Sequence, residues 1–214
     1  MVRTALQKAR EAPYSTKARI LAAAEAVFAA KGFDGASTRE IAAQAGVNIS
    51  SLHYHWESKE TLYFAVFQNI YDRIVELLRT SIPVRPDAAR GGRPVVETIM
   101  GGLFDFFADN PNVPKLMVRR LLENDAAEVE IERDILLPAW KVFAGWITEL
   151  SGRKLKDADS QLFMLTIHSV LLVFLLDSRQ YVSLLGGSVR APEWRRRVRS
   201  HVINLVKRLV TARD

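Results

Sequence analysis

Residues 38–56 read TREIAAQAGVNISSLHYHW: a short helix, a glycine turn and a second short helix. The first helix is predicted over residues 37–45, because Ser37 and Glu40 form a capping box at its start. Gly46 then ends it, since glycine adopts turn conformations that other residues resist. Residues 48–56 can form the second helix. The pattern predicts a helix-turn-helix, whose second helix enters the major groove of DNA.

The second of these helices is expected to present one face outward. With Leu52 directed into the core and successive residues turned by about 100°, Ser50 and Tyr54 lie nearly opposite, at about 160° and 200°. Trp56 returns toward the core. The outward face is small, polar and aromatic and has no carboxylate, so it is suited to approach base edges and phosphates.

Helical periodicity continues on both sides of this segment. A helix is predicted over residues 15–31, with apolar positions from Ile20 to Phe28 and a stop at Gly32. Ser58 is a good N-cap for a long helix that runs to about Ser81. Residues 1–13 are interpreted as a polar, flexible arm.

The C-terminal part is also predicted to be helical, with proline and glycine at its divisions. Residues 82–94 are expected to form a loop, and Pro138 should kink or split the helix around it. The helices expected here cover residues 94–110, 114–124, 127–150, 157–181 and 192–210. No stretch alternates long enough to indicate a strand, so the predicted fold class is all-α, with about nine helices.

Three parts follow from this pattern. We expect a flexible N-terminal arm at residues 1–13 and a helix-turn-helix DNA-binding domain at residues 14–60. A helical ligand-binding and dimerisation domain is expected at residues 61–214, joined to the first domain by the long helix.

Residues 17–67 resemble the tetracycline-repressor-like (TetR) family of regulators. The similar segments include ILAAA at 20–24, KGF at 31–33, AGV at 45–47, LHYHW at 52–56 and SKETL at 58–62. Each piece is common alone, but the combination is highly specific. Two positions depart from the family pattern: His53 replaces a tyrosine that often contacts phosphate, and Ile49 replaces a polar or basic residue. Ile49 therefore favours an apolar contact with a base.

The resemblance implies roles in DNA binding for particular residues. Thr38 and Arg39 begin a helix beside the DNA backbone, where amide donors and the helix dipole favour phosphate. Lys59 is implied to hold phosphate at the start of the next helix. Tyr54 could instead cover the edge of the core, and the angle of His55 tilts inward. The candidate DNA-binding residues are Thr38, Arg39, Asn48, Ile49, Ser50, Ser51, His53, Tyr54, His55 and Lys59.

The helix expected over residues 157–181 is apolar on all sides, so it must be covered on all sides. A dimer interface on one side and a core or pocket on the other would cover it. The family packs its last two long helices against their copies, which implies a homodimer. The predicted interface residues are Leu171, Phe174, Trp194, Val198, Val202, Leu205 and Leu209.

The resemblance also implies a pocket for a small-molecule effector. Aromatic residues and methionine suit an apolar or aromatic ligand. Ordinary core packing explains the same residues at helical spacing, so both interpretations stay open. The candidate lining residues are Phe104, Phe107, Met117, Trp140, Phe143, Trp146, Phe163 and His168.

Composition restricts the remaining possibilities. The net charge of +6 favours polyanions such as DNA, and the absence of cysteine excludes a disulfide framework. The most apolar run, residues 162–176, is shorter than the roughly 20 residues of a membrane span, so we expect a cytoplasmic protein without membrane contact. His53 and His55 point about 200° apart on a helix, so no shared metal is expected. No cofactor is expected either.

The sequence has no Walker loop, no Rossmann glycine pattern, no HExxH and no nucleophile elbow, so we do not expect an enzyme. The prediction is a ligand-responsive transcription regulator, a repressor that an effector releases from a palindromic operator on double-stranded DNA. The alternatives are a transcriptional activator, a ligand-independent architectural DNA-binding protein, or a dimeric adaptor without DNA binding.

Overall fold

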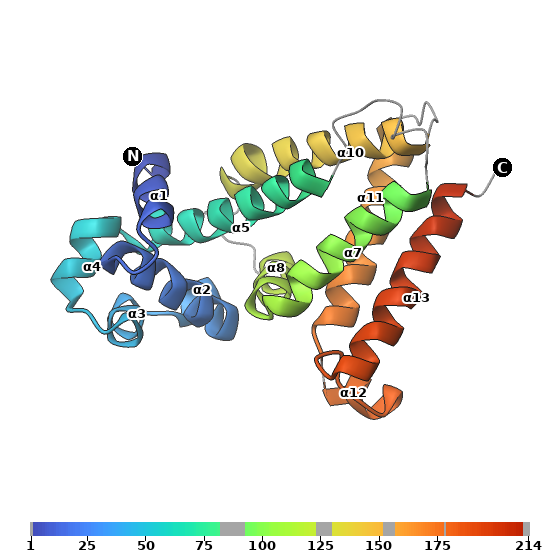
Figure 1. Ribbon diagram of the computed structural model, residues 1–214. Helices are drawn as coiled ribbons and strands as arrows, with labels where there is room; N and C mark the ends of the chain where they lie inside the picture. Colours follow the sequence, from blue (N-terminus) through green and yellow to red (C-terminus); the bar gives the residue numbers. More distant parts are fainter. Residues whose placement is uncertain (1, 82–92, 123–129, 152–156, 178, 212–214) are drawn as a thin grey trace. The chain divides into compact units, whose positions relative to one another are not determined.

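The computed structural model describes residues 2–81, 93–122, 130–151, 157–177 and 179–211, and the elements in these ranges are all helical (Figure 1). The all-α prediction is confirmed. The elements are α1 (Val2–Glu11), α2 (Thr16–Gly35), α3 (Thr38–Ala45), α4 (Ile49–Trp56), α5 (Lys59–Ser81), α7 (Arg93–Asp109), α8 (Asn112–Leu122), the π-helix η1 (Glu132–Leu136), α10 (Leu137–Ser151), α11 (Asp157–Leu175), α12 (Arg179–Leu185) and α13 (Pro192–Thr211). Most of the loop expected over residues 82–94 lies outside the described ranges.

The chain divides into two compact units, which are described separately. Unit 1 comprises Met1–Asp72 and Lys115–Leu136, and unit 2 comprises Arg73–Pro114 and Leu137–Asp214. This division differs from the boundary expected at residue 60. The first half of α5 belongs to unit 1 because Tyr63 and Phe67 are buried among the N-terminal helices.

An aromatic cluster fills the core of unit 1. The ring of Tyr63 on α5 lies 4.9 Å from Phe28, 5.0 Å from Phe33 and 5.0 Å from Phe67 between centroids. Edge-to-face pairs of this kind contribute about 0.5–1.5 kcal/mol each beyond the area that they bury. The cluster joins α2 to α5, and it therefore holds the helix-turn-helix on the long helix.

The N-terminal segment corrects the sequence prediction of a flexible arm, which was wrong. Residues 2–11 form α1, and Leu6 and Ala9, three positions apart on one face, are buried. Arg10 forms an ion pair of 2.8 Å with Asp72 on α5 and donates to Asn69 at 3.1 Å. Two apolar positions, Leu6 and Ala9, form too short a pattern to indicate a helix.

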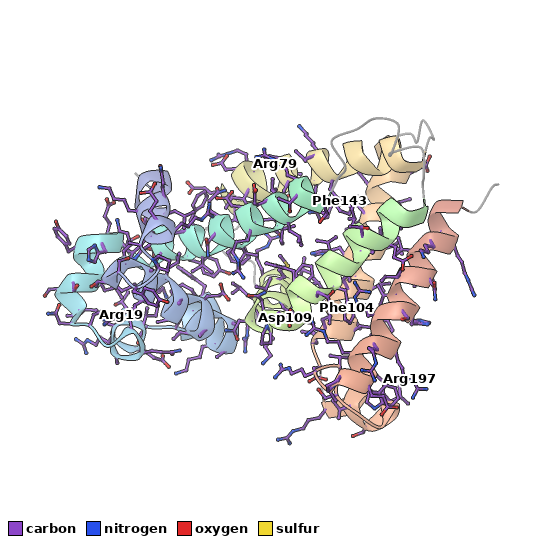
Figure 2. The ribbon with its side chains drawn as sticks, in the orientation of Figure 1. Arg19, Arg79, Phe104, Asp109, Phe143 and Arg197 are labelled. Carbon is purple, nitrogen blue, oxygen red and sulfur yellow. The ribbon has the colours of Figure 1, made fainter. Side chains whose placement is uncertain are left out.

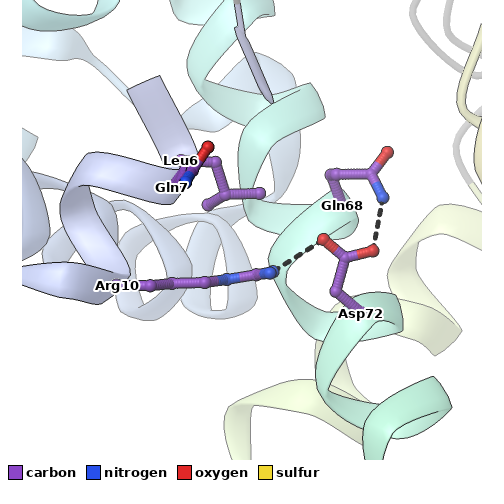
Figure 3. Close-up of a pocket in the computed structure, with 5 residues that line it drawn as sticks. All are labelled: Leu6, Gln7, Arg10, Gln68 and Asp72. Carbon is purple, nitrogen blue, oxygen red and sulfur yellow. Dashed lines mark hydrogen bonds and ion pairs between the residues drawn. The ribbon is translucent and has the colours of Figure 1, made fainter. Parts of the chain in front are cut away.

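An open groove lies between α1 and α5 (Figure 3). Its charged edge is the Arg10–Asp72 ion pair, and the amide of Gln68 donates to Asp72 at 2.7 Å. Because these polar groups satisfy one another, we assign the groove no ligand.

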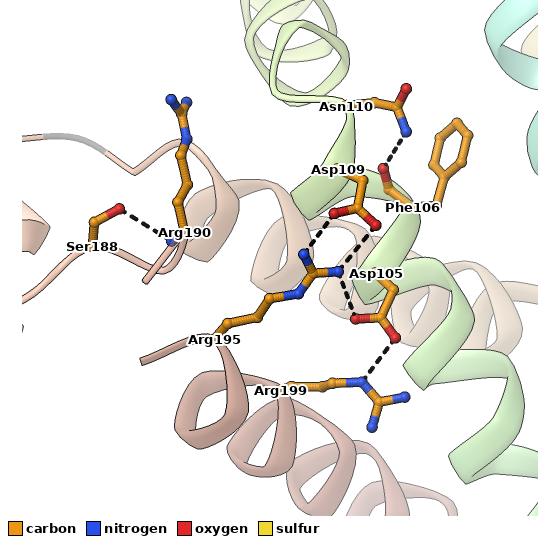
Figure 4. A network of polar contacts seen from close by, with 8 residues as sticks. All are labelled: Asp105, Phe106, Asp109, Asn110, Ser188, Arg190, Arg195 and Arg199. Atoms are coloured by element: carbon orange, nitrogen blue, oxygen red, sulfur yellow. Dashed lines mark hydrogen bonds and ion pairs between the residues drawn. The ribbon is translucent and has the colours of Figure 1, made fainter. Parts of the chain in front are cut away.

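In unit 2, α7, α11 and α13 pack on one another, and α10 packs on α11 (Figure 1). Arg195 on α13 donates to Asp105 and Asp109 on α7, and Arg199 donates to Asp105 at 3.0 Å (Figure 4). The hydrogen bonds from Arg195 lower the pKa of the Asp109 carboxyl below its usual range. These ion pairs fix the polar edge of the contact between α7 and α13.

Two helix boundaries differ from expectation or refine it: the end of α11 in unit 2, and the junction of η1 with α10, where the chain passes from unit 1 to unit 2. The helix expected to end near residue 181 ends at Leu175, and Asp177 adopts a left-handed conformation with φ of 53°. The carboxylate of Asp177 accepts from the Val189 backbone at 3.1 Å, which stabilises this break. Pro138 follows the π-helix η1 at the start of α10, so the predicted disruption around this proline is confirmed.

Within the described ranges, no single helix is long and apolar enough to cross a membrane. The pair Gln161–Leu175 and Arg179–Leu185 meets the length and composition criteria only when taken together, and it is bent by 85°.

Candidate nucleic-acid interface

Residues close together in the sequence determine where the helices of the helix-turn-helix begin and end. Ser37 Oγ accepts from the Glu40 backbone at 3.2 Å, which caps α3 at its start. Gly46 ends α3 with φ of 64°, and the Val47 backbone donates to the Ala42 carbonyl at 3.0 Å. This is a Schellman turn, in which glycine has no Cβ to strain the left-handed conformation.

Arg19 on α2 locks this turn from outside (Figure 2). Its guanidinium donates to the Ala45 carbonyl at 2.7 and 3.1 Å and to the Gly46 carbonyl at 2.8 Å. These carbonyls lie at the end of α3, where they have no partner within the helix. Sequence reasoning missed this role, because no spacing rule connects positions 26 residues apart.

The side chains of α4 have the orientations predicted from its sequence. Leu52 and Trp56 are buried, whereas Ser50 is exposed and Tyr54 is 84% exposed. Ile49, also exposed, extends the same surface. These orientations leave a helix face without carboxylates open to an approaching polyanion.

Two predicted contact residues at the start of α4, Asn48 and Ser51, are also part of the structure of the domain itself. The side-chain oxygen of Asn48 accepts from the Ser51 backbone at 2.7 Å, so Asn48 is the N-cap of α4. Ser51 is half-buried. The amide nitrogen of Asn48 is the group of this side chain that is left to donate to DNA.

The two histidines of α4 differ in their environments. His53 is exposed, and its Nδ1 donates to the Glu57 carbonyl at 3.1 Å, because a carbonyl oxygen can only accept. His55 is half-buried, and burial, followed by the charge of Lys17, lowers its pKa. In the tautomer of His53 that donates from Nδ1, the other ring nitrogen, Nε2, is an acceptor.

The cations at the two helix starts are used differently. Arg39 is exposed at the start of α3, beside half-buried Thr38. Lys59 was expected to hold phosphate, but its ammonium donates to the Phe33 carbonyl at 3.0 Å and the Ala36 carbonyl at 3.3 Å. It also lies 4.1 Å from the centroid of the Phe33 ring. Two of its three N–H donors are therefore engaged at the end of α2.

Arg119 on α8 supports α2 from another side. Gly32 interrupts α2 with φ of 75°, and Arg119 donates to the Ala29 carbonyl at 3.0 Å and the Ala30 carbonyl at 2.6 Å. A break in the helix leaves carbonyls of the preceding turn without their usual amide partners. Arg119 lies in the part of the sequence that we expected to belong to the ligand domain, so sequence reasoning missed it.

The candidate effector-binding residues are mainly core residues. Phe104, Phe107 and Phe143 are buried in unit 2, while Met117 is buried in unit 1. Figure 2 labels Phe104 on α7 and Phe143 on α10. The side chain of Trp146 lies outside the described residues.

One pair of these candidates comes together in the structure. The rings of Trp140 on α10 and half-buried His168 on α11 lie 6.0 Å apart, edge to face. Phe163 is half-buried on the same helix as His168.

Three of the predicted interface residues are buried within a single chain. Leu171, Val198 and Val202 are buried within unit 2, which leaves little of their surface for a second copy. The reason is that α13 packs on α7 and α11, which cover the apolar stripe of α13 that the sequence assigned to a partner. Phe174, Trp194 and Leu205 are half-buried, and Leu209 is exposed.

Residues 20–66, which hold α3, α4 and most of α2, match the family described as "Bacterial regulatory proteins, tetR family". This domain is a member of the TetR family. The match ends within α5, so it covers the helix-turn-helix and the first turns of the long helix.

Relatives of the TetR-family domain carry the names of transcription regulators. The chain is 51% identical over 63 residues to the HTH-type transcriptional dual regulator CecR of Shigella flexneri, covering 29% of this chain and 28% of the relative. It is 33% identical to the transcriptional activator FasR of Mycolicibacterium smegmatis, covering 51% and 46%. It is 31% identical to the transcriptional repressor SCO4008 of Streptomyces coelicolor, covering 57% and 58%. The chain therefore spans between about a quarter and three fifths of these relatives, and none of the three is named as an enzyme.

Solved structures share the fold over most of the chain. A putative tetR family regulator from Shewanella sp. PV-4 matches with a TM-score of 0.64 and 23% identity, covering 93% of this chain and 100% of that one. The putative transcriptional regulator SCO4942 of Streptomyces coelicolor matches with a TM-score of 0.61 and 22% identity, covering 91% and 98%. At this identity the likeness establishes the fold, and the arrangement of helices beyond the TetR-family domain is shared with both structures.

Proposed function

We propose that this protein is a transcription regulator that binds operator DNA through the exposed face of α4. The observation that carries the proposal is Tyr54, which is 84% exposed on a helix whose opposite face is buried through Leu52 and Trp56. Exposing the apolar ring of Tyr54 to solvent is unfavourable. Contact of its ring and hydroxyl with DNA phosphates or bases explains why the side chain nevertheless points outward. Ser50 and Ile49 supply a polar and an apolar contact on the same face, and Arg39 supplies a cation at the start of α3.

The regulator acts, in this proposal, as a homodimer on a near-palindromic operator. Support comes from α11, where Leu162, Leu165 and Val173 are exposed at helical spacing. An apolar stripe of this kind marks an interaction surface. Leu209 on α13 is also exposed. A second copy that covers these residues would present two copies of α4 to two half-sites.

The proposal includes an apolar or aromatic effector bound in unit 2 that releases the protein from DNA. It is supported by the aromatic content of α7 and α10, and by the Trp140–His168 pair, which places one polar ring in an apolar setting. Repression is proposed as the mode of action. Activation and ligand-independent architectural binding are the alternatives.

A gel shift on the promoter beside the encoding gene tests DNA binding, and footprinting then defines the site. We expect a protected near-palindrome with two chains bound. Protection of one unrepeated site by one chain would contradict the dimer, and no binding to that promoter or to random DNA would contradict the function itself. Repeating the shift with cell metabolites distinguishes release, which supports an effector-controlled repressor, from unchanged binding, which supports the architectural alternative.

A further inference from the structure

The cations of residues 5–72 fall into two groups, and side chains are described throughout this stretch. Four of them have partners: Arg10 pairs with Asp72, Lys31 pairs with Glu40, and Arg19 and Lys59 donate to backbone carbonyls. The other three are Lys8, Lys17 and Arg39, for which the described residues provide no hydrogen bond or ion pair. These three are the cations of this stretch that are available to an external anion.

Lys17 lies beside the C-terminal end of α4, and Lys8 lies on α1, which packs against α4; both are outside the region covered by the family match. Lys8 is exposed on α1, and Lys17 lies in the first turn of α2. The ammonium of Lys17 lies 5.5 Å from the centroid of the Trp56 ring, at the last residue of α4. Both α1 and α2 pack against α4, so the two lysines lie on the two helices that flank the recognition helix.

The electrostatic coupling between these groups indicates that they form one positive surface. Burial and then the charge of Lys8 lower the pKa of Lys17, and Lys17 in turn lowers the pKa of His55. The two like charges repel each other, and an anion bound between them would offset this repulsion. The nearby carboxylate of Glu11 accepts a hydrogen bond from Gln7 at 2.8 Å and forms no ion pair with either lysine.

We propose that Lys8 and Lys17 bind backbone phosphates of the DNA that α4 enters, so that the contact surface extends from the helix-turn-helix onto α1. The inference rests on the proposed DNA-binding function. The partner is the phosphate backbone of double-stranded DNA, because two ammonium groups on neighbouring helices match a polyanion with regularly spaced charges. Such contacts position the protein and carry no sequence information directly.

The experiment measures the salt dependence of the dissociation constant of full-length protein, on operator and on random duplex DNA. Each phosphate contact contributes about 0.9 to the slope of log K against log salt concentration. Because both chains of the proposed dimer lose the contact, we expect Lys8→Gln and Lys17→Gln each to reduce the magnitude of the slope by about 1.8, and the double variant by about 3.6. The losses should be equal on both DNAs.

The matched control is Lys115→Gln, which removes one charge from an exposed position of unit 1 on α8. Its slope should equal that of the wild type. Lys17→Arg keeps the charge and should keep the slope, whereas a purely structural role against Trp56 would leave the slope unchanged even in Lys17→Gln. Thermal unfolding of each variant separates loss of contact from loss of fold, and Lys8→Gln should unfold like the wild type because its side chain is exposed.

A wild-type slope in the double variant, with DNA binding intact, overturns this inference and leaves the proposed function standing. Failure of the wild-type protein to bind any DNA overturns both. Loss of slope in Lys115→Gln equal to that in Lys8→Gln also overturns the inference, since it would reflect net charge alone.

Discussion

Three basic side chains, those of Lys59, Arg19 and Arg119, donate to backbone carbonyls. In each case the carbonyls lie where a helix ends or is interrupted. Arg119 binds those of the turn before Gly32, Lys59 binds those at the end of α2, and Arg19 binds those at the end of α3. The C-terminal end of a helix carries partial negative charge and unpaired carbonyl acceptors, so a cation there is stabilised both by the helix dipole and by hydrogen bonds. At the residue scale, a basic side chain in this domain can therefore stabilise the fold by binding backbone carbonyls, and it need not contact DNA.

The first prediction concerns Lys59. Lys59→Met keeps an unbranched apolar side chain but removes the ammonium, and with it two charge-assisted hydrogen bonds and the cation contact with the Phe33 ring, so it should lower the free energy of unfolding by about 1–3 kcal/mol. Urea denaturation measures this as a lower midpoint with an unchanged m-value. Unchanged stability combined with a flatter salt slope for DNA binding would assign Lys59 to phosphate alone.

The second prediction concerns Tyr54. Tyr54→Ala should weaken binding to the operator by about 1–3 kcal/mol, roughly 5- to 150-fold, and weaken binding to random DNA less. Stability should change little, because the side chain is 84% exposed. Tyr14→Ala is the control, since Tyr14 is 94% exposed and lies outside α3 and α4. Equal losses on both DNAs would reduce Tyr54 to a phosphate contact.

At the scale of elements, α2 depends on a helix that is remote in sequence. Its interruption at Gly32 leaves the carbonyls of Ala29 and Ala30 to Arg119 of α8. The segment Lys115–Leu136 consequently belongs to unit 1 rather than to the C-terminal unit. This assigns α8 a part in supporting the DNA-binding helices.

The third prediction follows from this contact. Arg119→Met leaves two carbonyls without a donor and should lower the free energy of unfolding by about 1–3 kcal/mol. Amide hydrogen exchange should show faster opening around residues 29–36. Arg120→Met, on the same helix, is the comparison variant. Protection in α2 equal to the wild type would show that Arg119 does not support the kink.

The exposed face of α11 yields the fourth prediction. Leu165 is 44% exposed, and Leu165→Glu should disfavour dimerisation by placing an unpaired charge in the proposed interface. Val142 on α10 is 43% exposed, so Val142→Glu adds the same charge at a matched position outside that face. Light scattering at micromolar concentration should show monomers for the first variant and dimers for the second. A dimer in both would place the interface elsewhere.

At the scale of the whole molecule, α5 is continuous from Lys59 to Ser81 and contributes to both units. It begins next to the helix-turn-helix, and its last turns belong to unit 2. The chain passes between the two units at three places, within α5 after Asp72, after Pro114 and after Leu136, and α5 is the crossing that lies next to the helix-turn-helix in the sequence.

The fifth prediction is that effector and operator weaken each other equally. Coupling between two sites is typically about 1–3 kcal/mol, or about 5- to 150-fold in affinity, and it must be reciprocal. Mass spectrometry of a co-purified small molecule identifies the effector, and calorimetry then measures its affinity with and without operator. Equal affinities in the two titrations would reject induction and leave DNA binding intact.

The helix-turn-helix was predictable because its signals are local. The Ser37 cap, the left-handed Gly46 and the outward direction of Tyr54 each depend on neighbours within a few residues, and the structure has all three. The same holds for the disruption before Pro138. Helix geometry at 100° per residue is sufficient to separate the buried Leu52 from the exposed Tyr54.

Tertiary structure decided what depends on distant partners. Lys59 and Arg19 meet carbonyls 26 residues away, and Arg119 meets one 90 residues away, at distances that no local periodicity encodes. Leu171 and Val202 lie on apolar stripes that suit a second copy or the chain's own core equally well, and only the packing of α7, α11 and α13 assigns them to the core. A sequence determines which face of a helix is apolar, whereas the arrangement of the other helices determines what covers that face.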